Sequence, residues 1–308
     1  MRDEAREQRV RRRMLQPVQL ALYLAGSVLS LMAVAPLFWM VSMSLKETNE
    51  VFSANLIPHR PTLDNFIYVF TQVNFLRYLW NTFFVSAVVT IVALAFHSMA
   101  GYALARLRFP GRDVIFLAMF ATFLVSQPVI IVPLFILART LGLLDSYAGL
   151  IVPSIFNAFG IFLLRQFYLG IPRELEEAAI VDGAGYFRIY WSIILPLSRP
   201  ILSALAILFF LANWNSFLWP LTITSNQDLW MVQVAIASFR QQYVGSWNYI
   251  MAASTVVVLP TLAMFVVFQK RIIESIKTTG IKGRQGGSGD DGSLFRSQYG
   301  PRQSVAPL

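Results

Sequence analysis

The segment from Trp80 to Ala103 reads WNTFFVSAVVTIVALAFHSMAGYA and contains no Asp, Glu, Lys or Arg. A bilayer core about 30 Å thick is crossed by roughly 20 apolar helical residues, so this segment is long enough to span a membrane as one helix. Five further stretches are similarly apolar and uncharged: Val18 to Val41, Val114 to Ala138, Ala148 to Leu164, Ile201 to Ile223 and Tyr249 to Phe268. We therefore predict an all-α integral membrane protein with six transmembrane helices.

The composition of the whole chain agrees with this class. Of its 308 residues, 56% are apolar and only 13% are charged, whereas a soluble domain is about a quarter charged. Every charged residue falls outside the six stretches, as expected because a charge at the bilayer centre costs about 3 kcal/mol or more. The chain has no cysteine and only two histidines, His59 and His97, which excludes thiolate and His-rich metal sites.

The first stretch has features of a signal peptide, because it follows Arg11, Arg12 and Arg13. It continues through Pro36 to Val41, however, and is longer than the apolar region of about 7 to 15 residues in a cleaved signal. A retained helix is the preferred interpretation, and a cleaved signal is the alternative.

The basic residues predict the orientation, because cytoplasmic loops of membrane proteins carry an excess of Lys and Arg. Twenty of the 25 lie in the two terminal segments and in the second-to-third and fourth-to-fifth helix connections. Both termini are therefore expected in the cytoplasm. The net charge of +9 is explained by orientation, and it gives no reason to expect nucleic-acid binding.

The predicted chain has three parts. Residues 1–17 form a cytoplasmic N-terminal segment, and residues 18–283 form the transmembrane domain, with a core at about 80–270. Residues 284–308 include the sequence GGSGDDG, whose composition predicts a disordered tail. Two connections are longer than a hairpin requires: residues 42–79 predict an extracytoplasmic lobe, and residues 165–200 predict a cytoplasmic loop.

The cytoplasmic loop contains the segment GIPRELEEAAIVDGAGYFRIYWSIILP, from Gly170 to Pro196. Pro172 suits a first helical turn, and the acidic residues that follow complement the positive end of the helix dipole. These acids are Glu174, Glu176 and Glu177. Gly183 is expected to end this helix in a left-handed conformation.

A second short helix should run from Tyr186 to about Leu195 and stop at Pro196. On the first helix, a spacing of three, four and seven places four residues on one face: Leu175, Ala178, Ala179 and Asp182. Small alanines allow close approach of another surface, which favours contact with a protein over a helix that lies on lipid headgroups.

The loop also has a recognisable signature: Glu177-Ala178-Ala179, three residues, Gly183, nine residues, Ile193, one residue, Leu195-Pro196. This spacing resembles the loop of permease subunits from bacterial ABC importers. The resemblance extends over about residues 15 to 283 and is closest to the carbohydrate importers, specifically the shorter, six-helix partner of the maltose-transporter type. Further matching positions are Asp182, Ala184, Pro200, Gly101 to Arg106, Phe109 to Arg112, Trp214-Asn215, Phe217 to Pro220 and Thr279 to Gly283. At Ser216, many relatives have an acidic residue instead.

The resemblance implies the fold of a type I ABC importer permease, in which this loop forms a coupling helix that docks in a cleft of a cytoplasmic ATPase. ATP-driven closure of two ATPases would rock the bundle between inward- and outward-facing states. The implied coupling residues are Glu177, Ala178, Ala179, Asp182, Gly183, Ala184, Ile193 and Pro196.

The implied location is the bacterial inner membrane, in contact with lipid. The implied partners are a second homologous permease subunit, two ATP-binding cassette ATPases and an extracytoplasmic sugar-binding protein. No Gly-x-x-x-x-Gly-Lys-Ser/Thr sequence occurs in the chain, so this phosphate-binding loop is absent. We expect ATP and Mg on the ATPase, and no cofactor, metal or catalytic residue on this chain.

Polar and aromatic residues mark a candidate translocation pathway, because amides and aromatic rings suit a sugar. Such side chains at membrane depth also form interhelical hydrogen bonds, and both interpretations stay open. Gln127-Pro128 and Pro133 could break the third helix and line a cavity, although a packing kink is preferred. The candidate pathway residues are Asn213, Trp214, Asn215, Ser216, Trp219 and Gln127.

Other classes of membrane protein fit less well. An ion-coupled secondary transporter would place carboxylates inside the helices, and a membrane-embedded enzyme would need paired aspartates or two metal-binding histidines. Neither set is present in the six stretches. We therefore predict a permease subunit that translocates a sugar or oligosaccharide delivered by a binding protein. The alternative is the same role for a glycerophosphodiester or polyol, and a secondary transporter is a distant alternative.

Overall fold

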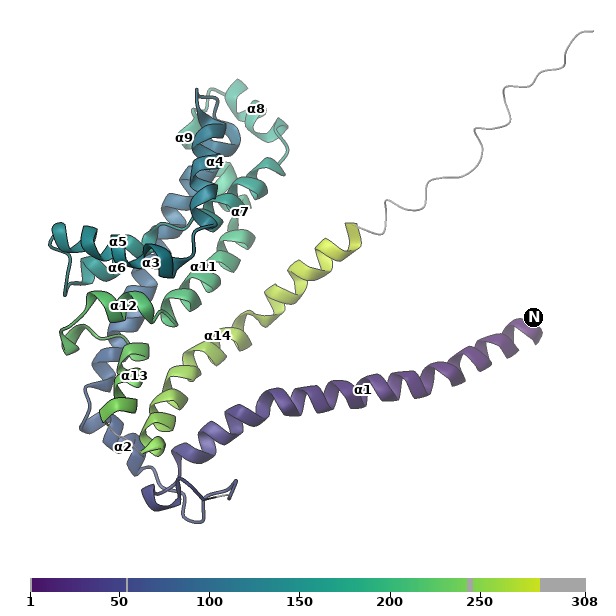
Figure 1. Cartoon of the computed structure of the whole chain (residues 1–308). Coiled ribbons are helices and arrows are strands. Elements are labelled where there is room, and N and C mark those ends of the chain that lie inside the picture. Colours follow the sequence, from purple (N-terminus) through teal and green to yellow (C-terminus); the bar gives the residue numbers. More distant parts are fainter. Residues whose placement is uncertain (1, 54, 243–245, 283–308) are drawn as a thin grey trace, which may run out of the picture. The chain divides into compact units, whose positions relative to one another are not determined.

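The structure, a computed structural model, describes residues 2–53, 55–242 and 246–282. These residues form helices joined by short connections, with no β-strand among them (Figure 1). The predicted all-α class is therefore confirmed for this part of the chain, while the predicted tail at 284–308 lies outside it. The chain divides into two compact units, Met1–Thr261 and Leu262–Leu308, and the contacts below all lie within the first.

Three helices are long and apolar enough to cross a membrane: α1 (Arg2–Ser44), α3 (Phe75–Arg106) and α14 (Trp247–Lys282), the first through Gln19–Ser44 and the last through Trp247–Val266. Three pairs reach this length only together. They are α4 (Arg112–Phe123) with α5 (Gln127–Thr140), α6 (Tyr147–Ile155) with α7 (Ala158–Leu169), and Tyr186–Leu197 with α11 (Arg199–Trp214), bent by 105°, 41° and 75°. Length and composition thus allow three spans in the described residues, or up to six if each bent pair is one span.

The predicted third span, Val114 to Ala138, is broken rather than kinked, so the preferred interpretation of this segment is wrong. Ser126 precedes α5 with extended backbone, at ψ 143°, and Pro128 lies in the first turn of α5. Proline is tolerated there because the N–H groups of a first turn have no intrahelical acceptor. Pro133 lies inside α5 without ending it.

The fifth predicted span also differs from the structure. α11 ends at Trp214, and a separate short helix, α12 (Leu218–Ile223), follows it. The preceding helix does not stop at Pro196: α9 (Tyr186–Ile189), a π-helical turn (Tyr190–Ile194) and α10 (Leu195–Leu197) follow one another without a break. Pro196 lies in the first turn of α10, and the bend comes only after Leu197.

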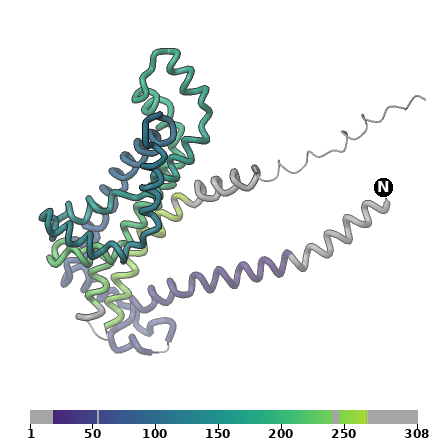
Figure 2. Tube along the Cα trace, turned by 45° about the horizontal axis from the view of Figure 1, so that its top comes forward, coloured from purple at the N-terminus to yellow at the C-terminus, as the bar shows by residue number. Residues whose placement is uncertain are grey.

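α3 is the central element of the first unit, and α6, α7 and α11 all pack against it (Figure 2). Glycine allows this close packing. A Cβ added to Gly160 on α7 would lie 2.4 Å from Cζ of Phe209 and 2.8 Å from Nδ1 of His97. His97 itself is buried on α3, and its Nε2 accepts a hydrogen bond from the N–H of Asn157. His97 is thus a packed polar residue of the helix bundle.

The connection between α1 and α3 forms a small lobe with a 3₁₀ turn (Thr48–Glu50) and α2 (Asp64–Thr71). The ammonium group of buried Lys46 donates to the carbonyl of Asn55 at 2.6 Å. The side-chain amide of Asn65 donates to the carbonyls of Ser44 and Lys46, both at 2.8 Å. Hydrogen bonds within the lobe therefore stabilise the folded conformation of this connection.

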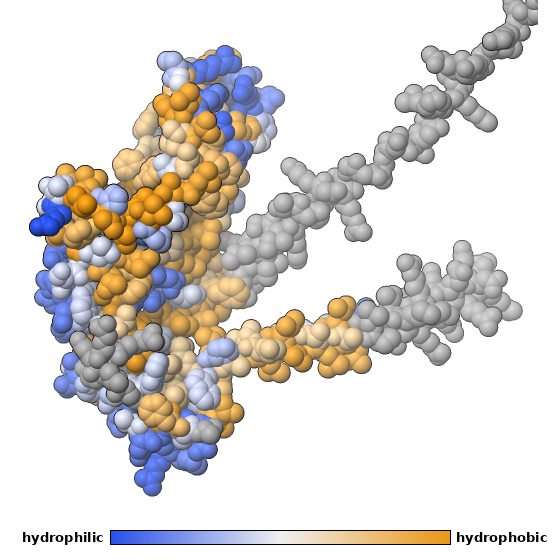
Figure 3. Space-filling view, viewed as in Figure 1, coloured by the Kyte–Doolittle hydropathy of each residue, from blue (hydrophilic) through white to orange (hydrophobic). Residues whose placement is uncertain are grey.

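Large apolar side chains are exposed along the helices, and Figure 3 shows hydrophobic surface over α4 and α5. On these two helices Leu117, Val129 and Val132 are each more than half exposed. Such a surface is expected where helices contact lipid, because a soluble monomer rarely exposes a large apolar patch.

Candidate functional site

The first helix of the predicted loop is α8, Glu174–Val181. Gly183 follows it with φ +80°. The N–H of Gly183 donates to Ile180 O, and the N–H of Ala184 donates to Ala179 O, both at 2.9 Å. These are the two hydrogen bonds of a Schellman motif, which ends a helix with a left-handed residue. The left-handed conformation predicted for Gly183 is confirmed.

The surface of α8 differs between neighbouring residues. Glu177, Ala178 and Asp182 are exposed, whereas Glu176 is buried. The apolar side chains of Val181 and Phe187 are 87% and 72% exposed. Further exposed apolar side chains on the same loop are Leu175, Ile180, Tyr186 and Trp191. A loop that exposes both carboxylates and large apolar side chains is suited to contact with another protein.

Four of the predicted coupling residues do not share this surface. Ala179, Ala184 and Ile193 are partly buried, and they pack against a buried cluster that includes Tyr168 and Tyr190. Pro196 is exposed and lies on α10 rather than α8. The structure thus separates the predicted coupling residues into those exposed on α8 or directly after it, those that hold the loop against the bundle, and Pro196, which is exposed on α10.

Glu176 forms a buried ion pair with Arg106, at the end of α3. Arg106 Nε lies 2.9 Å from Glu176 Oε1, and the two side chains are 4% and 10% exposed. Arg106 Nη2 also donates to the carbonyls of Tyr168, at 2.5 Å, and Ile171. The guanidinium of Arg106 therefore connects three elements: α3, the end of α7 and α8.

Burial raises the pKa of the Glu176 carboxyl above its ordinary value. The positive charges of Arg106 and Arg173 and the nearby hydroxyl of Tyr102 oppose this rise. From the sequence, Glu176 is expected to complement the helix dipole. Arg106 is expected to mark the cytoplasmic side, with contact to an ATPase as the second interpretation. Their contact was missed because the two residues are far apart in the sequence and no local pattern pairs them.

A second set of buried contacts joins the loop to α3. The hydroxyl of Tyr190, in the π-helical turn, donates to Ser98 Oγ at 2.9 Å, and Ser98 Oγ lies 2.7 Å from the hydroxyl of Tyr168. The ring of Tyr102 packs against both tyrosines, with centroid distances of 5.4 Å to Tyr190 and 6.3 Å to Tyr168. The segments on both sides of Gly183 are thus anchored to the last turns of α3.

Two of the predicted pathway residues are buried in helix contacts. The indole N–H of Trp214 donates to Val257 O at 3.2 Å, and that of Trp219 donates to Gly149 O at 3.0 Å. Both indoles therefore form interhelical hydrogen bonds, which is one of the two interpretations left open for these residues.

The remaining pathway residues are more accessible. Asn213 and Ser216 are partly buried, and Asn215 is exposed. The amide of Asn215 donates to a backbone carbonyl on α11, and its oxygen accepts from the side chain of Gln233 at 3.3 Å. Gln127 is exposed at the first position of α5.

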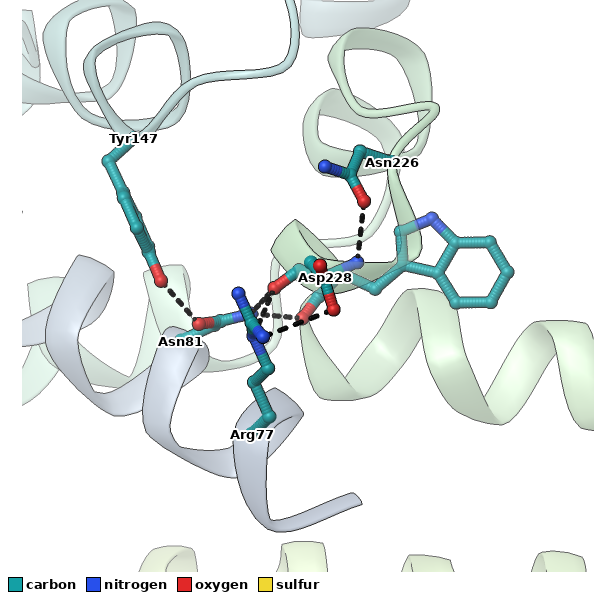
Figure 4. Close-up of polar contacts among 6 residues, drawn as sticks. Arg77, Asn81, Tyr147, Asn226 and Asp228 are labelled. Atoms are coloured by element: carbon teal, nitrogen blue, oxygen red, sulfur yellow. Dashed lines mark hydrogen bonds and ion pairs between the residues drawn. The ribbon is translucent and has the colours of Figure 1, made fainter. Parts of the chain in front are cut away.

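A further polar network lies at the opposite end of α3 and was not predicted (Figure 4). Arg77 Nη1 is 3.1 Å from Asp228 Oδ1. The amide of Asn81 donates to the carbonyls of Asp228 and Trp230, at 2.8 and 3.1 Å, and its oxygen accepts from the hydroxyl of Tyr147 at 2.6 Å. The network fixes the connection that leads into α13 (Val232–Gln242).

Near this connection, the carboxylate of Asp145 accepts the backbone N–H groups of Ser225 and Asn226, at 2.6 and 2.8 Å. Asp145 has φ 49°, a conformation that aspartate adopts more readily than most residues. The connection after α5 therefore holds the connection after α12.

The described residues contain no group of three or more His, Cys, Asp or Glu that could hold a metal ion. An open cavity of about 570 Å³ is lined by residues 108, 109, 111–114 and 173. It adjoins the start of α4 and the residue before α8, and none of the predicted pathway residues lines it. It does not identify the translocation pathway.

Comparison with known proteins identifies relatives of this chain. Residues 97–278 match the family described as binding-protein-dependent transport system inner membrane component. The chain is 34% identical to the arabinooligosaccharides transport system permease protein AraQ of Halalkalibacterium halodurans, over 83% of this chain and 93% of that protein. It is also 34% identical to the diacetylchitobiose uptake system permease protein NgcG of Streptomyces coelicolor, over 80% and 83%.

A solved structure has the same fold. It is a chain from the crystal structure of a bacterial ABC transporter involved in the import of the acidic polysaccharide alginate. The TM-score is 0.75 at 24% sequence identity, and the match covers 83% of this chain and 96% of that one.

Proposed function

This chain belongs to the family of binding-protein-dependent transport system inner membrane components, and we propose that it is the membrane-spanning permease subunit of an ATP-driven ABC importer for a sugar or oligosaccharide. Relatives that match most of its length are permeases for arabino-oligosaccharides and diacetylchitobiose. These relatives support a saccharide over a glycerophosphodiester or polyol, and they support ATP-driven import over ion-coupled transport.

In this proposal each bent helix pair crosses the membrane once, which gives six spans. The lengths and hydropathies of the three long helices and the three bent pairs support this count. Both termini and the α8 loop then face the cytoplasm, where the excess of Lys and Arg is expected. The lobe between α1 and α3 lies on the opposite side, where a binding protein would deliver the solute.

The energy source is a partner, since the sequence contains no phosphate-binding loop of the Gly-x-x-x-x-Gly-Lys type. Two ATPase subunits would bind ATP and Mg in the cytoplasm, and a second homologous permease would complete the membrane domain. This chain is a transport subunit without catalytic residues of its own.

The observation that carries the proposal is the outward surface of α8. Glu177, Ala178 and Asp182 are exposed beside the apolar side chains of Val181 and Phe187. An exposed carboxylate next to alanine fits a cleft that contains a basic residue and has room for the helix backbone. We propose that α8 is the coupling helix and that this surface docks on the ATPase.

The residues on the inner side of the loop have a supporting role in this proposal. Ala179, Ala184 and Ile193 pack against the bundle, Gly183 makes the turn, and Pro196 precedes the bend into α11. For the pathway, we propose that Asn213, Asn215, Ser216 and Gln127 offer their polar atoms to the solute. The buried Trp214 and Trp219 would support the pathway wall.

The test is ATP-dependent uptake by cells that carry the complete transporter. Radiolabelled arabinotriose, diacetylchitobiose and sn-glycerol 3-phosphate are the probes. Deletion of this chain should abolish uptake of a saccharide probe, and Glu177→Lys should have the same effect without loss of the chain from the membrane. Glu174→Lys makes the same charge change on an exposed glutamate one turn earlier on α8, and it shows whether the loss of uptake is specific to Glu177.

Two results would contradict the proposal. Uptake of glycerol 3-phosphate alone would replace the saccharide with a non-sugar solute, a phosphorylated polyol. Normal uptake with Glu177→Lys, together with normal recovery of the ATPase on the purified chain, would remove α8 from the docking surface.

A further inference from the structure

Docking of α8 on an ATPase moves a solute only if the displacement of α8 reaches the helices that line the pathway. Resting on the function proposed above, we propose that the ion pair between Arg106 and Glu176 is the joint that transmits displacement of α8 to α3. Arg106 and Glu176 are then positioning residues: they touch neither the solute nor ATP, and they act through α3.

The burial of this pair distinguishes it from the other ion pairs among the described residues. Its side chains are 4% and 10% exposed, whereas those of Arg77 and Asp228 are 51% and 49% exposed. An arginine that only marks the cytoplasmic side needs no buried partner, because topology depends on charge near the membrane ends. A buried pair adds little net stability, but its disruption on one side leaves an unpaired buried charge. The two helices therefore resist separation.

The geometry at Arg106 favours a rigid connection. A guanidinium is planar and holds its donors in a fixed arrangement, and here it contacts the carboxylate of Glu176 and the carbonyls of Tyr168 and Ile171. Those carbonyls lie at the end of α7 and directly after it. When α8 moves away from α3, Arg106 must either follow it or lose its contact to Glu176.

The second contact acts in parallel on the other side of the loop. Tyr190 donates to Ser98 Oγ, and Ser98 lies about two turns before Arg106 on α3. Tyr190 belongs to a π-helical turn, a rare geometry that occurs frequently at functional sites. Both ends of the loop are therefore fixed to the segment of α3 from Ser98 to Arg106. Because α7 and α11 also pack on α3, α3 can pass the displacement to the rest of the bundle.

The test compares two variants of one residue in the complete transporter, reconstituted in liposomes with its binding protein. Glu176→Gln keeps the size of the side chain and removes its charge, whereas Glu176→Asp keeps the charge. Glu174→Gln is the comparison variant, because it makes the same chemical change at an exposed position of α8 that takes no part in the ion pair. Arabinotriose and diacetylchitobiose are the probes, and the readouts are solute taken up per ATP hydrolysed and the amount of ATPase recovered with the chain.

We expect Glu176→Gln to lower uptake per ATP by about tenfold or more while ATP hydrolysis and ATPase recovery continue, because a buried pair is broken on one side. Glu176→Asp should recover most of the coupling, and Glu174→Gln should leave uptake per ATP unchanged, because its carboxylate takes no part in the ion pair. If the ion pair had a purely structural role, Glu176→Gln would lower ATPase recovery, ATP hydrolysis and uptake together. The amount of solute taken up per ATP hydrolysed would then stay unchanged.

Two outcomes would refute this role of the ion pair between Arg106 and Glu176. One is that uptake per ATP with Glu176→Gln stays within about twofold of the wild type, because breaking a buried pair that transmits the displacement should lower it much further. The other is loss of ATPase recovery in parallel with uptake, which would make the pair a determinant of folding. Absence of ATP-dependent uptake by the wild-type transporter would instead refute the proposed function itself.

Discussion

Substitution of Gly183 separates the backbone geometry of the loop from its contact with a partner. Gly183 has φ +80°, and a Cβ built on it has no atom of the chain within 4 Å. Within this chain, a larger side chain therefore meets only the penalty of the left-handed conformation and no steric clash. Any additional effect of side-chain size must come from another molecule.

The magnitudes follow from these two observations. A non-glycine residue in the left-handed conformation costs roughly 1–2 kcal/mol. Because RT is about 0.59 kcal/mol at 25 °C, Gly183→Ala should lower the population of the native turn by a factor of about 5 to 30. Asparagine tolerates this conformation better, so Gly183→Asn should be milder. Gly183→Leu should destabilise the isolated chain about as much as Gly183→Ala.

The assay is thermal unfolding of the purified chain combined with ATPase recovery and ATP-dependent uptake. If Gly183 faces the ATPase, Gly183→Leu should lose far more ATPase recovery and uptake than Gly183→Ala, although their unfolding temperatures are similar. Equal recovery with Leu and Ala would place Gly183 outside the docking surface. Destabilisation by Gly183→Asn as large as that by Gly183→Ala would refute the argument from backbone conformation.

A methyl group at Gly160 would lie 2.4 Å from Cζ of Phe209, so Gly160→Ala should destabilise the chain by about 1–3 kcal/mol and lower its unfolding temperature. Gly26→Ala is the control and should not, because a Cβ built at Gly26 has no neighbouring atom within 4 Å. Asp145→Ala removes an acceptor of two backbone N–H groups and should cost about 1 kcal/mol by denaturant unfolding, with Asp145→Asn milder. Because burial raises the pKa of Glu176 despite the arginines beside it, the free energy of unfolding should fall as pH rises from the ordinary glutamate pKa through the raised one. Glu176→Gln should lack this fall, and identical pH profiles would contradict the assignment.

The membrane class could be predicted from the sequence because the bilayer imposes it on every residue. Charged residues are excluded from the hydrocarbon region, so uncharged apolar stretches such as Trp80 to Ala103 stand out from composition alone. α3 contains this stretch and is one uninterrupted helix. The 105° bend between α4 and α5 was not predicted, because proline inside an apolar stretch is compatible with a kink, a break or a regular first turn.

The turn at Gly183 could also be predicted, since local chain geometry determines it. A Schellman motif depends only on hydrogen bonds within six consecutive residues, and glycine after an alanine-rich helix indicates it. The indole donors of Trp214 and Trp219 depend instead on Val257 and Gly149, which lie on other helices. Helix packing selects these acceptors, and packing has no short-range signal in the sequence.

Glu176 and Glu177 show most clearly where sequence reasoning ends. The two residues have the same side chain and adjacent positions, yet one is paired with Arg106 in the interior and the other is exposed. Successive residues of an α-helix point about 100° apart, so a helix that lies against the bundle must place two neighbouring glutamates in different surroundings. The family signature includes Glu177 and not Glu176. This agrees with the structure, in which Glu177 is available for contact with a partner and Glu176 is paired with Arg106 of the same chain. If both proposals hold, one glutamate receives the displacement from the ATPase and its neighbour transmits it to α3, so Glu177→Lys should lose ATPase binding whereas Glu176→Gln should retain ATPase binding and lose coupling.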